Sequence, residues 1–101
     1  MVQEITDVSQ IPQGGKVVLD FYADWCGPCK RIAGVYVELS EKYPNISFFK
    51  VNVDEAQSLS EEFGVEALPT FVIINNGNIV KRIEGADPNA LLKAVDELKN
   101  A

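Results

Sequence analysis

The chain has 101 residues, of which 47% are apolar and 24% charged, and its net charge is −6 at pH 7. These values predict one soluble domain, residues 1–101, with a substantial core. The acidic balance disfavours nucleic acid, no segment has the roughly 18 to 20 consecutive apolar residues of a membrane helix, and the absence of histidine excludes catalysis by an imidazole base.

The first half of the chain predicts strands around a helix. A first strand is expected before residue 7, whereas residues 7–15, with Pro12 and two glycines, are too irregular to assign. Residues 16–23 and 46–53 are nearly continuous apolar segments, which is typical of central strands covered on both faces. Between them, apolar residues recur at helical spacing and predict a helix that ends before Pro44.

The second half predicts a short helix, for which Asp54 and Gln57 would form an N-cap and capping box. Two apolar segments, residues 70–75 and 78–84, flank an Asn-Gly dipeptide, which is the strongest local signal for a hairpin. Asp87 and the proline after it then begin a last amphipathic helix. This order of elements predicts an α/β fold around a mixed sheet.

The only two cysteines, Cys26 and Cys29, lie at the N-terminal end of the first predicted helix. A structural zinc site needs four ligands, and the chain supplies one cysteine pair and no histidine, so we expect no metal. A purely structural disulfide would close a loop of four residues, worth about 2 kcal/mol by the loop-entropy relation.

Reversible redox chemistry is the third interpretation of the pair. Unpaired backbone N–H groups at a helix N-terminus stabilise a thiolate at Cys26. Pro28 is tolerated in the first helical turn, and Gly27 leaves the attacking sulfur uncrowded. In the cytosol, a disulfide is more often catalytic than structural.

Three motifs carry a resemblance to a known family. They are Trp-Cys-Gly-Pro-Cys-Lys at residues 25–30, Ala-Leu-Pro-Thr at 67–70 and Glu-Gly-Ala at 84–86. With the predicted elements around them, the chain resembles the thioredoxin family over essentially its full length. The resemblance implies a five-stranded mixed sheet with helices on both faces. It also implies a protein-disulfide reductase without a bound cofactor, recharged from NADPH by a flavin-dependent thioredoxin reductase.

The resemblance also assigns roles to site residues. Cys26 is expected to be an exposed nucleophile, Cys29 a buried resolving thiol, and Asp20 the base behind it, with Lys50 close by. Two mid-strand charges could instead form a buried ion pair without a chemical role. Pro69 is expected to be a cis proline facing the pair, whereas a proline in a simple loop would be trans.

The family's flat docking surface would surround the active sulfur. The matching residues are Trp25, Gly27, Pro28, Val65, Leu68, Pro69, Gly85 and Ala86. Such a patch suits varied extended peptides. The alternative for a lone tryptophan is core packing. Gly34 stands where the family usually has a helix-kinking proline, so the kink is in doubt.

The family further implies partners, namely thioredoxin reductase and disulfide proteins such as peroxiredoxins, ribonucleotide reductase and methionine sulfoxide reductase. The first ten residues lack the features of a signal peptide, so we expect a cytoplasmic protein. We also expect it to be a monomer. Two rival functions remain: an oxidase or isomerase on the same fold, and a docking module in which redox chemistry is incidental.

Overall fold

The structure is a computed structural model that describes residues 1–101. A five-stranded sheet has the order β1-β3-β2-β4-β5, in which β1, β3 and β2 are parallel and β4 is antiparallel to both of its neighbours, β2 and β5. The strands are β1 (Val2–Glu4), β2 (Lys16–Tyr22), β3 (Ile46–Asn52), β4 (Thr70–Asn75) and β5 (Asn78–Glu84). The helices are the 3-10 helix η1 (Val8–Gln10), α1 (Gly27–Lys42), α2 (Gln57–Glu62) and α3 (Pro88–Lys99). The predicted mixed sheet is therefore confirmed.

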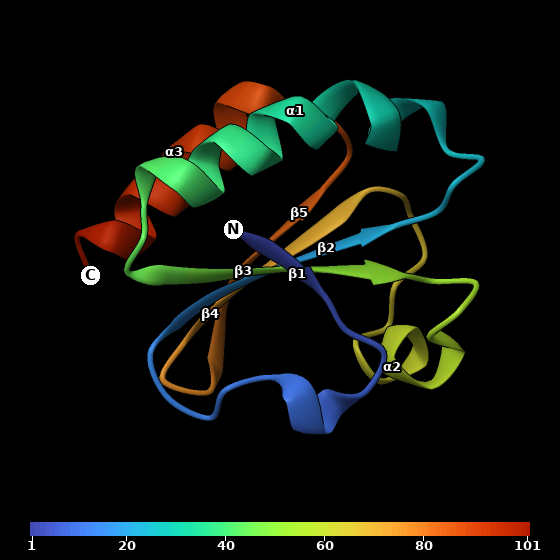
Figure 1. Cartoon of the computed structure of the whole chain (residues 1–101), viewed down its shortest axis with the longest axis horizontal. Helices are drawn as coiled ribbons and strands as arrows, with labels where there is room; N and C mark the ends of the chain where they lie inside the picture. The colour runs from blue at the N-terminus through green and yellow to red at the C-terminus, as the bar shows by residue number, and fades with distance from the viewer.

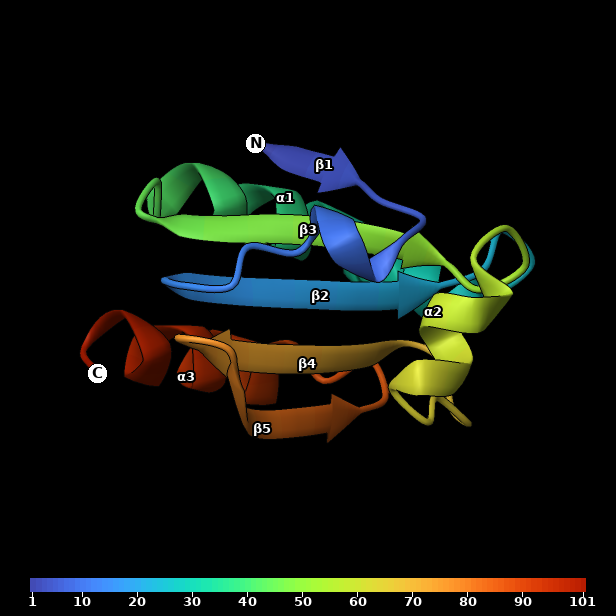
Figure 2. The ribbon, with the colours of Figure 1, turned by 90° about the horizontal axis from the view of Figure 1, so that it is seen from below.

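Helices cover the sheet unequally on its two faces. Figure 1 shows α1 and α3 side by side on one face and η1 and α2 on the other, and Figure 2 shows the sheet from the second face. A cluster of 13 buried residues lies under α1 and α3, and one of ten lies on the opposite face. The central strand β2 contributes to both clusters, which explains its nearly unbroken apolar sequence.

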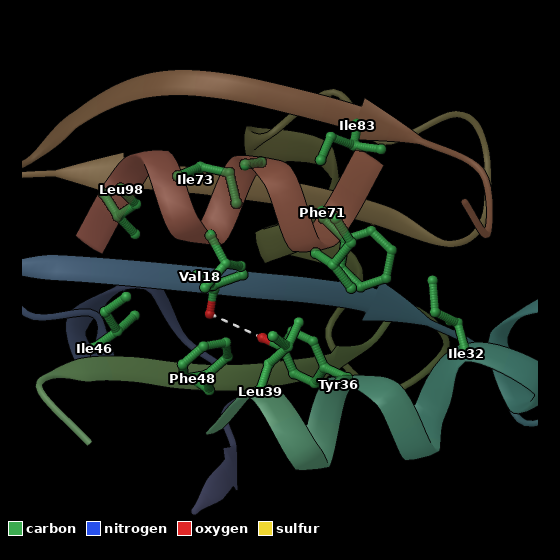
Figure 3. Packing of buried hydrophobic residues seen from close by; sticks show 13 residues of the cluster. Val18, Ile32, Tyr36, Leu39, Ile46, Phe48, Phe71, Ile73, Ile83 and Leu98 are labelled. Carbon is green, nitrogen blue, oxygen red and sulfur yellow. Dashed lines mark hydrogen bonds between the residues drawn. The ribbon is translucent and has the colours of Figure 1, made fainter. Parts of the chain in front are cut away.

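Tyr36 ties α1 to the sheet from inside the larger cluster. Its ring is 2% exposed and lies between Phe48 and Phe71. Its hydroxyl donates to the carbonyl of Phe49, at 2.6 Å, and lies 3.1 Å from the carbonyl of Val18 (Figure 3). One buried hydroxyl thus bridges α1 to β3 and β2, and burial raises the pKa of Tyr36 well above its usual value.

The predicted hairpin and last helix are confirmed. Asn76 and Gly77 have φ values of 50° and 84°, the left-handed conformations that a tight hairpin turn requires. Asp87 caps α3 by accepting from the backbone N–H of Ala90, and Pro88 occupies the first turn.

The predicted cap of α2 is wrong. The helix begins at Gln57 after Ala56, and no side chain caps it. The chain first makes a turn in which the carbonyl of Asn52 accepts from the N–H groups of Glu55 and Ala56, so the helix starts later than the Asp54 pattern suggests. The unassigned segment 7–15 contains η1, which Asp7 and Gln10 cap reciprocally.

Helix α1 runs from Gly27 to Lys42 without interruption at Gly34. Gly34 is exposed, and a Cβ atom there would meet nothing within 4 Å. The chain therefore has a continuous helix where the resemblance left a kink in doubt. None of the three α-helices has the length and apolar character that crossing a bilayer requires.

Candidate active site

A disulfide joins Cys26 and Cys29 at the point where the chain leaves β2 and enters α1. Cys26 is the N-cap of α1, and its Sγ accepts a hydrogen bond from the backbone N–H of Cys29 at 3.2 Å. Pro28 lies in the first turn, where its missing N–H costs no helical hydrogen bond. The sulfur of Cys26 thus lies at the positive end of the helix dipole, which favours negative charge.

In this disulfide form Cys29 is buried, as expected, whereas the expectation that Cys26 is exposed is wrong. Cys26 is 4% and Cys29 6% exposed. Both pack with Ala23, and the half-buried side chains of Tyr22 and Leu68 lie against this small cluster. The bridge draws the two sulfurs together, so exposure does not distinguish them.

The two cysteines differ in their surroundings, because only one of them lines a small pocket of about 170 Å³. Cys29 lines it, Cys26 does not, and Asp20 lies in it as well. The full lining is Asp20, Tyr22, Ala23, Asp24, Cys29, Lys30, Ala33 and Lys50. The pocket is polar in part and large enough to hold a water molecule.

Asp20 is a buried carboxyl, 7% exposed, in the middle of β2. Its Oδ1 atom has no hydrogen-bond partner in the protein. Burial raises the pKa of Asp20 to about 7, and the positive charge of Lys50 opposes this rise. A carboxyl with this pKa can both accept and release a proton near neutral pH.

Lys50 does not form the alternative buried ion pair with Asp20. The two residues are register partners on β3 and β2. However, the Lys50 Nζ lies 3.8 Å from the Glu4 Oε1, and the Lys50 side chain is 45% exposed. The sequence shows the two charges, Asp20 and Lys50, in two strands. Which carboxylate pairs with Lys50 depends on β1, because that strand supplies Glu4.

Trp25 lies on the surface beside the disulfide. It is 69% exposed, so the alternative of core packing is wrong. Its indole Nε1–H donates to Asp54 Oδ2 at 2.9 Å. This contact occupies the carboxylate that the sequence suggested as a helix cap, and it orients the indole next to the pair.

The peptide bond between Leu68 and Pro69 is cis, and Pro69 is buried. The backbone N–H of Gly85 donates to the Pro69 carbonyl at 2.9 Å, which joins the two loop segments of the expected docking surface. Leu68 reaches the cysteine cluster. Val65 instead packs against the core below α2, and Ala86 against the core below α3, so these two are only partly available at the surface.

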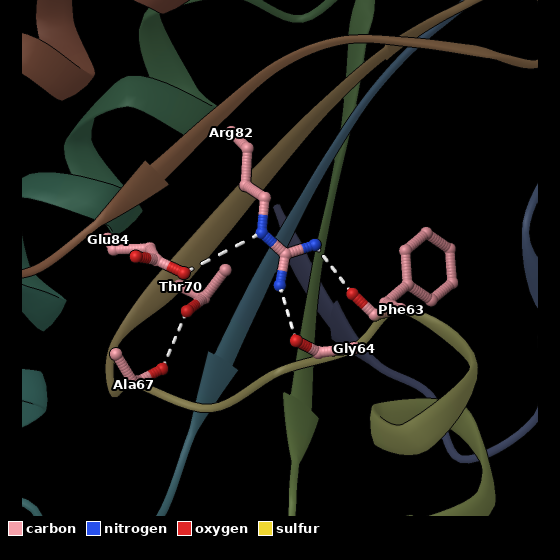
Figure 4. A network of polar contacts seen from close by, with 6 residues as sticks. All are labelled: Phe63, Gly64, Ala67, Thr70, Arg82 and Glu84. Carbon is pink, nitrogen blue, oxygen red and sulfur yellow. Dashed lines mark hydrogen bonds and ion pairs between the residues drawn. The ribbon is translucent and has the colours of Figure 1, made fainter.

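Arg82 is a residue that sequence reasoning missed. Its guanidinium donates to the carbonyls of Phe63 and Gly64, and its Nε lies 3.8 Å from Glu84 Oε2 (Figure 4). It thereby holds the end of α2 and the start of the loop that carries Val65 to Pro69. An arginine on an edge strand has no sequence signal that separates it from an ordinary surface charge.

The sequence was compared with protein families and with known proteins. The Thioredoxin family profile matches residues 4–97. The chain is 46% identical over 90 residues to Thioredoxin-like protein 1 of Schizosaccharomyces pombe, covering 87% of this chain and 31% of that protein. It is 44% identical over 87 residues to Thioredoxin-1 of Saccharomyces cerevisiae, covering 86% of this chain and 84% of that protein. It spans 59% of the length of Thioredoxin H5 of Arabidopsis thaliana.

The fold agrees with these similarities. The solved structure of Malassezia sympodialis Thioredoxin (Mala s 13) superposes with a TM-score of 0.90 at 40% identity, covering 98% of this chain and 91% of that one. Sequence and structure therefore agree over nearly the whole chain, and the chain belongs to the thioredoxin family.

Proposed function

We propose that the chain is a protein-disulfide reductase that donates two electrons from the Cys26–Cys29 pair. The observation that carries this proposal is the placement of the pair. One sulfur caps α1, and the other cysteine shares a pocket with a buried carboxyl whose pKa is about 7. A structural disulfide needs neither feature.

The proposed reaction begins with the reduced pair. The Cys26 thiolate attacks one sulfur of a substrate disulfide, forming a mixed disulfide and releasing the other substrate sulfur as a thiolate. The Cys29 thiolate then attacks the Cys26 sulfur and releases the second substrate sulfur. The substrate gains two electrons, and the chain is left with the disulfide seen here.

Asp20 is proposed as the base for the second step. Cys29 must lose its proton before it attacks, and the chain has no histidine to accept it. Asp20 lines the same pocket as Cys29, and its pKa of about 7 makes it a stronger base than an ordinary carboxylate.

Docking of the substrate is assigned to the surface around the pair. The exposed indole of Trp25 and the backbone beside Pro69 would hold an extended peptide, with Gly27 and Pro28 between the cysteines leaving room for its disulfide. Alignment of the reacting sulfurs contributes more to rate than thiolate acidity alone, because nucleophilicity falls as thiolate stability rises.

Membership of the thioredoxin family supports further proposals about the electron donor, the electron acceptors and the cellular location. Electrons would come from NADPH through a flavin-dependent thioredoxin reductase. Peroxiredoxins, ribonucleotide reductase and methionine sulfoxide reductase would be among the acceptors. We propose that residues 1–101 act as a single domain, as a monomer in the cytoplasm.

The first test is the reduction potential of the pair. The protein is equilibrated in glutathione or dithiothreitol redox buffers, and its free thiols are trapped and counted by mass. We expect a value near −270 mV, which is typical of thioredoxins, whereas a value of about −180 to −120 mV would indicate an oxidase or isomerase. Full biological activity in a Cys26→Ser, Cys29→Ser variant would instead favour the docking module.

A second prediction concerns Asp20→Asn. The variant should resolve a mixed disulfide at least tenfold more slowly, because general-base assistance typically contributes about 10²- to 10⁴-fold, while the attack of Cys26 changes less. Stopped-flow kinetics with a chromogenic disulfide, in which formation and resolution are separate phases, measures both. Equal slowing of the two phases would contradict the role of Asp20 as the base.

A further inference from the structure

Three charged residues form one row across the sheet. Glu4 is the register partner of Lys50, and Lys50 is the register partner of Asp20. Figure 2 shows their strands β1, β3 and β2 side by side in this order. Since side chains alternate along a strand, residues two positions apart share a face. Val2, Phe48 and Val18, which precede the row by two positions, all pack in or against the cluster under α1.

Lys50 is therefore placed between two carboxylates on one face of the sheet. It pairs with Glu4, at 3.8 Å, and leaves Asp20 Oδ1 without a partner. The Tyr22 hydroxyl donates to the same Glu4 Oε1 atom at 3.1 Å, and the Lys50 ammonium lies 5.7 Å from the Tyr22 ring centroid. Burial and the Glu4 carboxylate raise the pKa of Tyr22 to about 12, so its hydroxyl remains a donor at neutral pH.

The other groups around Asp20 do not offer it a competing partner. From α1, the exposed residue Lys30 lines the pocket, and the hydroxyl of Tyr36 is hydrogen-bonded to strand carbonyls. From the end of β2, Asp24 lines the pocket and accepts from Asn52. Lys50 is thus the cation whose position matters most for the charge state of Asp20, and it is the one that acts on Asp20 in the described structure.

We propose that Glu4 is a positioning residue for the reductase: by holding the Lys50 ammonium on the Glu4 side of the row, it keeps the Asp20 carboxyl without a counter-ion and thereby a strong base for Cys29. Glu4 touches neither cysteine and acts through Lys50. The inference rests on the proposed function of Asp20 for its effect on rate, although its effect on the charge state of Asp20 is independent of that function.

The test is the titration of Asp20 in the oxidised protein, followed by the carboxyl ¹³C resonance in NMR. In this form the cysteines do not titrate and the structure is the one described here. Glu4→Gln frees Lys50 to approach Asp20, so the midpoint of Asp20 should fall by about 1 pH unit. Lys50→Met removes the cation and should raise the midpoint.

The double variant separates action through Lys50 from direct repulsion between the two carboxylates. If Glu4 acts through Lys50, Glu4→Gln should have little effect when Lys50→Met is already present. An undiminished fall in that background would overturn the proposal, and so would an unchanged midpoint in the single variant. Glu97→Gln, on the exposed side of α3, makes the same change in net charge and should leave the midpoint in place.

The rate of mixed-disulfide resolution, measured as a function of pH in the same variants, tests whether the three charged residues affect catalysis. In Glu4→Gln the midpoint of the pH–rate profile should fall by the same amount as the NMR midpoint. The limiting rate at high pH should also fall, because the base is weaker. A shifted NMR midpoint with an unchanged rate profile would refute Asp20 as the base and leave the control of Lys50 by Glu4 intact.

Discussion

Asp20 is a carboxyl buried in the middle of an apolar strand, and its burial has a cost in stability at the scale of one residue. A charge in the middle of an apolar strand stands out in the sequence, so its burial could be predicted from β2 alone. Its freedom from an ion pair could not, because that depends on how β1 aligns with β3 and brings Glu4 to Lys50. The exposure of Cys26 was wrongly predicted for a similar reason, since its burial depends on the cluster that Cys26 forms with Ala23 and Cys29 in three dimensions.

The raised pKa of Asp20 predicts a pH-dependent penalty on stability. Its pKa is about 7 in the folded protein against 3.8 for an ordinary aspartate, so the folded state holds the proton more tightly. Stability is therefore greatest below about pH 4 for this group, falls between pH 4 and 7, and stays low above pH 7.

Asp20→Asn should remove this penalty. The variant should be more stable than the wild type by up to about 4 kcal/mol above pH 7 and by little near pH 4. Urea unfolding of both oxidised proteins at several pH values measures the difference. A difference that does not change between pH 4 and 8 would show that Asp20 titrates normally in the folded protein.

At the scale of the element, α1 has the redox pair at its N-terminus, with Cys26 as N-cap and Cys29 in the first turn, and Tyr36 on its buried face. The helical period and the proline near its start could be predicted from sequence, because both are local properties. The start of α2 could not be predicted, because Asn52 and Trp25 engage the residues that would otherwise form its cap.

Gly34 offers a test of α1 as an element. A glycine in a helix interior costs about 1 kcal/mol relative to alanine, and nothing near Gly34 would meet the added methyl group. Gly34→Ala should stabilise the protein by about 1 kcal/mol and raise its Tm by about 4 to 8 °C, without changing the reduction potential. Scanning calorimetry measures the change in Tm, and a lower Tm would show that α1 needs the glycine.

At the scale of the whole molecule, each face of the sheet has its own core and its own covering helices. One face holds the larger core under α1 and α3, and the other is closed by η1 and α2 (Figure 1). The layer arrangement follows from the order of the elements and could be predicted. The link from β5 to the end of α2 through Arg82 could not, because it joins side chain to backbone between segments that no sequence pattern relates.

Arg82→Met tests that link. Two carbonyls would lose a charged donor, so the free energy of unfolding should fall by about 2 kcal/mol, and amide exchange between residues 63 and 68 should become faster. Lys81→Met on the same strand removes the same charge without a carbonyl contact and should change neither. Equal effects of the two variants would reduce the role of Arg82 to its net charge.

The buried hydroxyl of Tyr36 also makes the stability of the fold depend on pH in the alkaline range. An unfolded chain exposes this phenol, which then ionises at its ordinary pKa of about 10, whereas the folded core holds its proton to higher pH. Alkali therefore favours the unfolded chain at this position, and ionisation would place a negative charge against the carbonyls of Val18 and Phe49. The hydroxyl that joins α1 to two strands at neutral pH therefore weakens the fold in strong alkali.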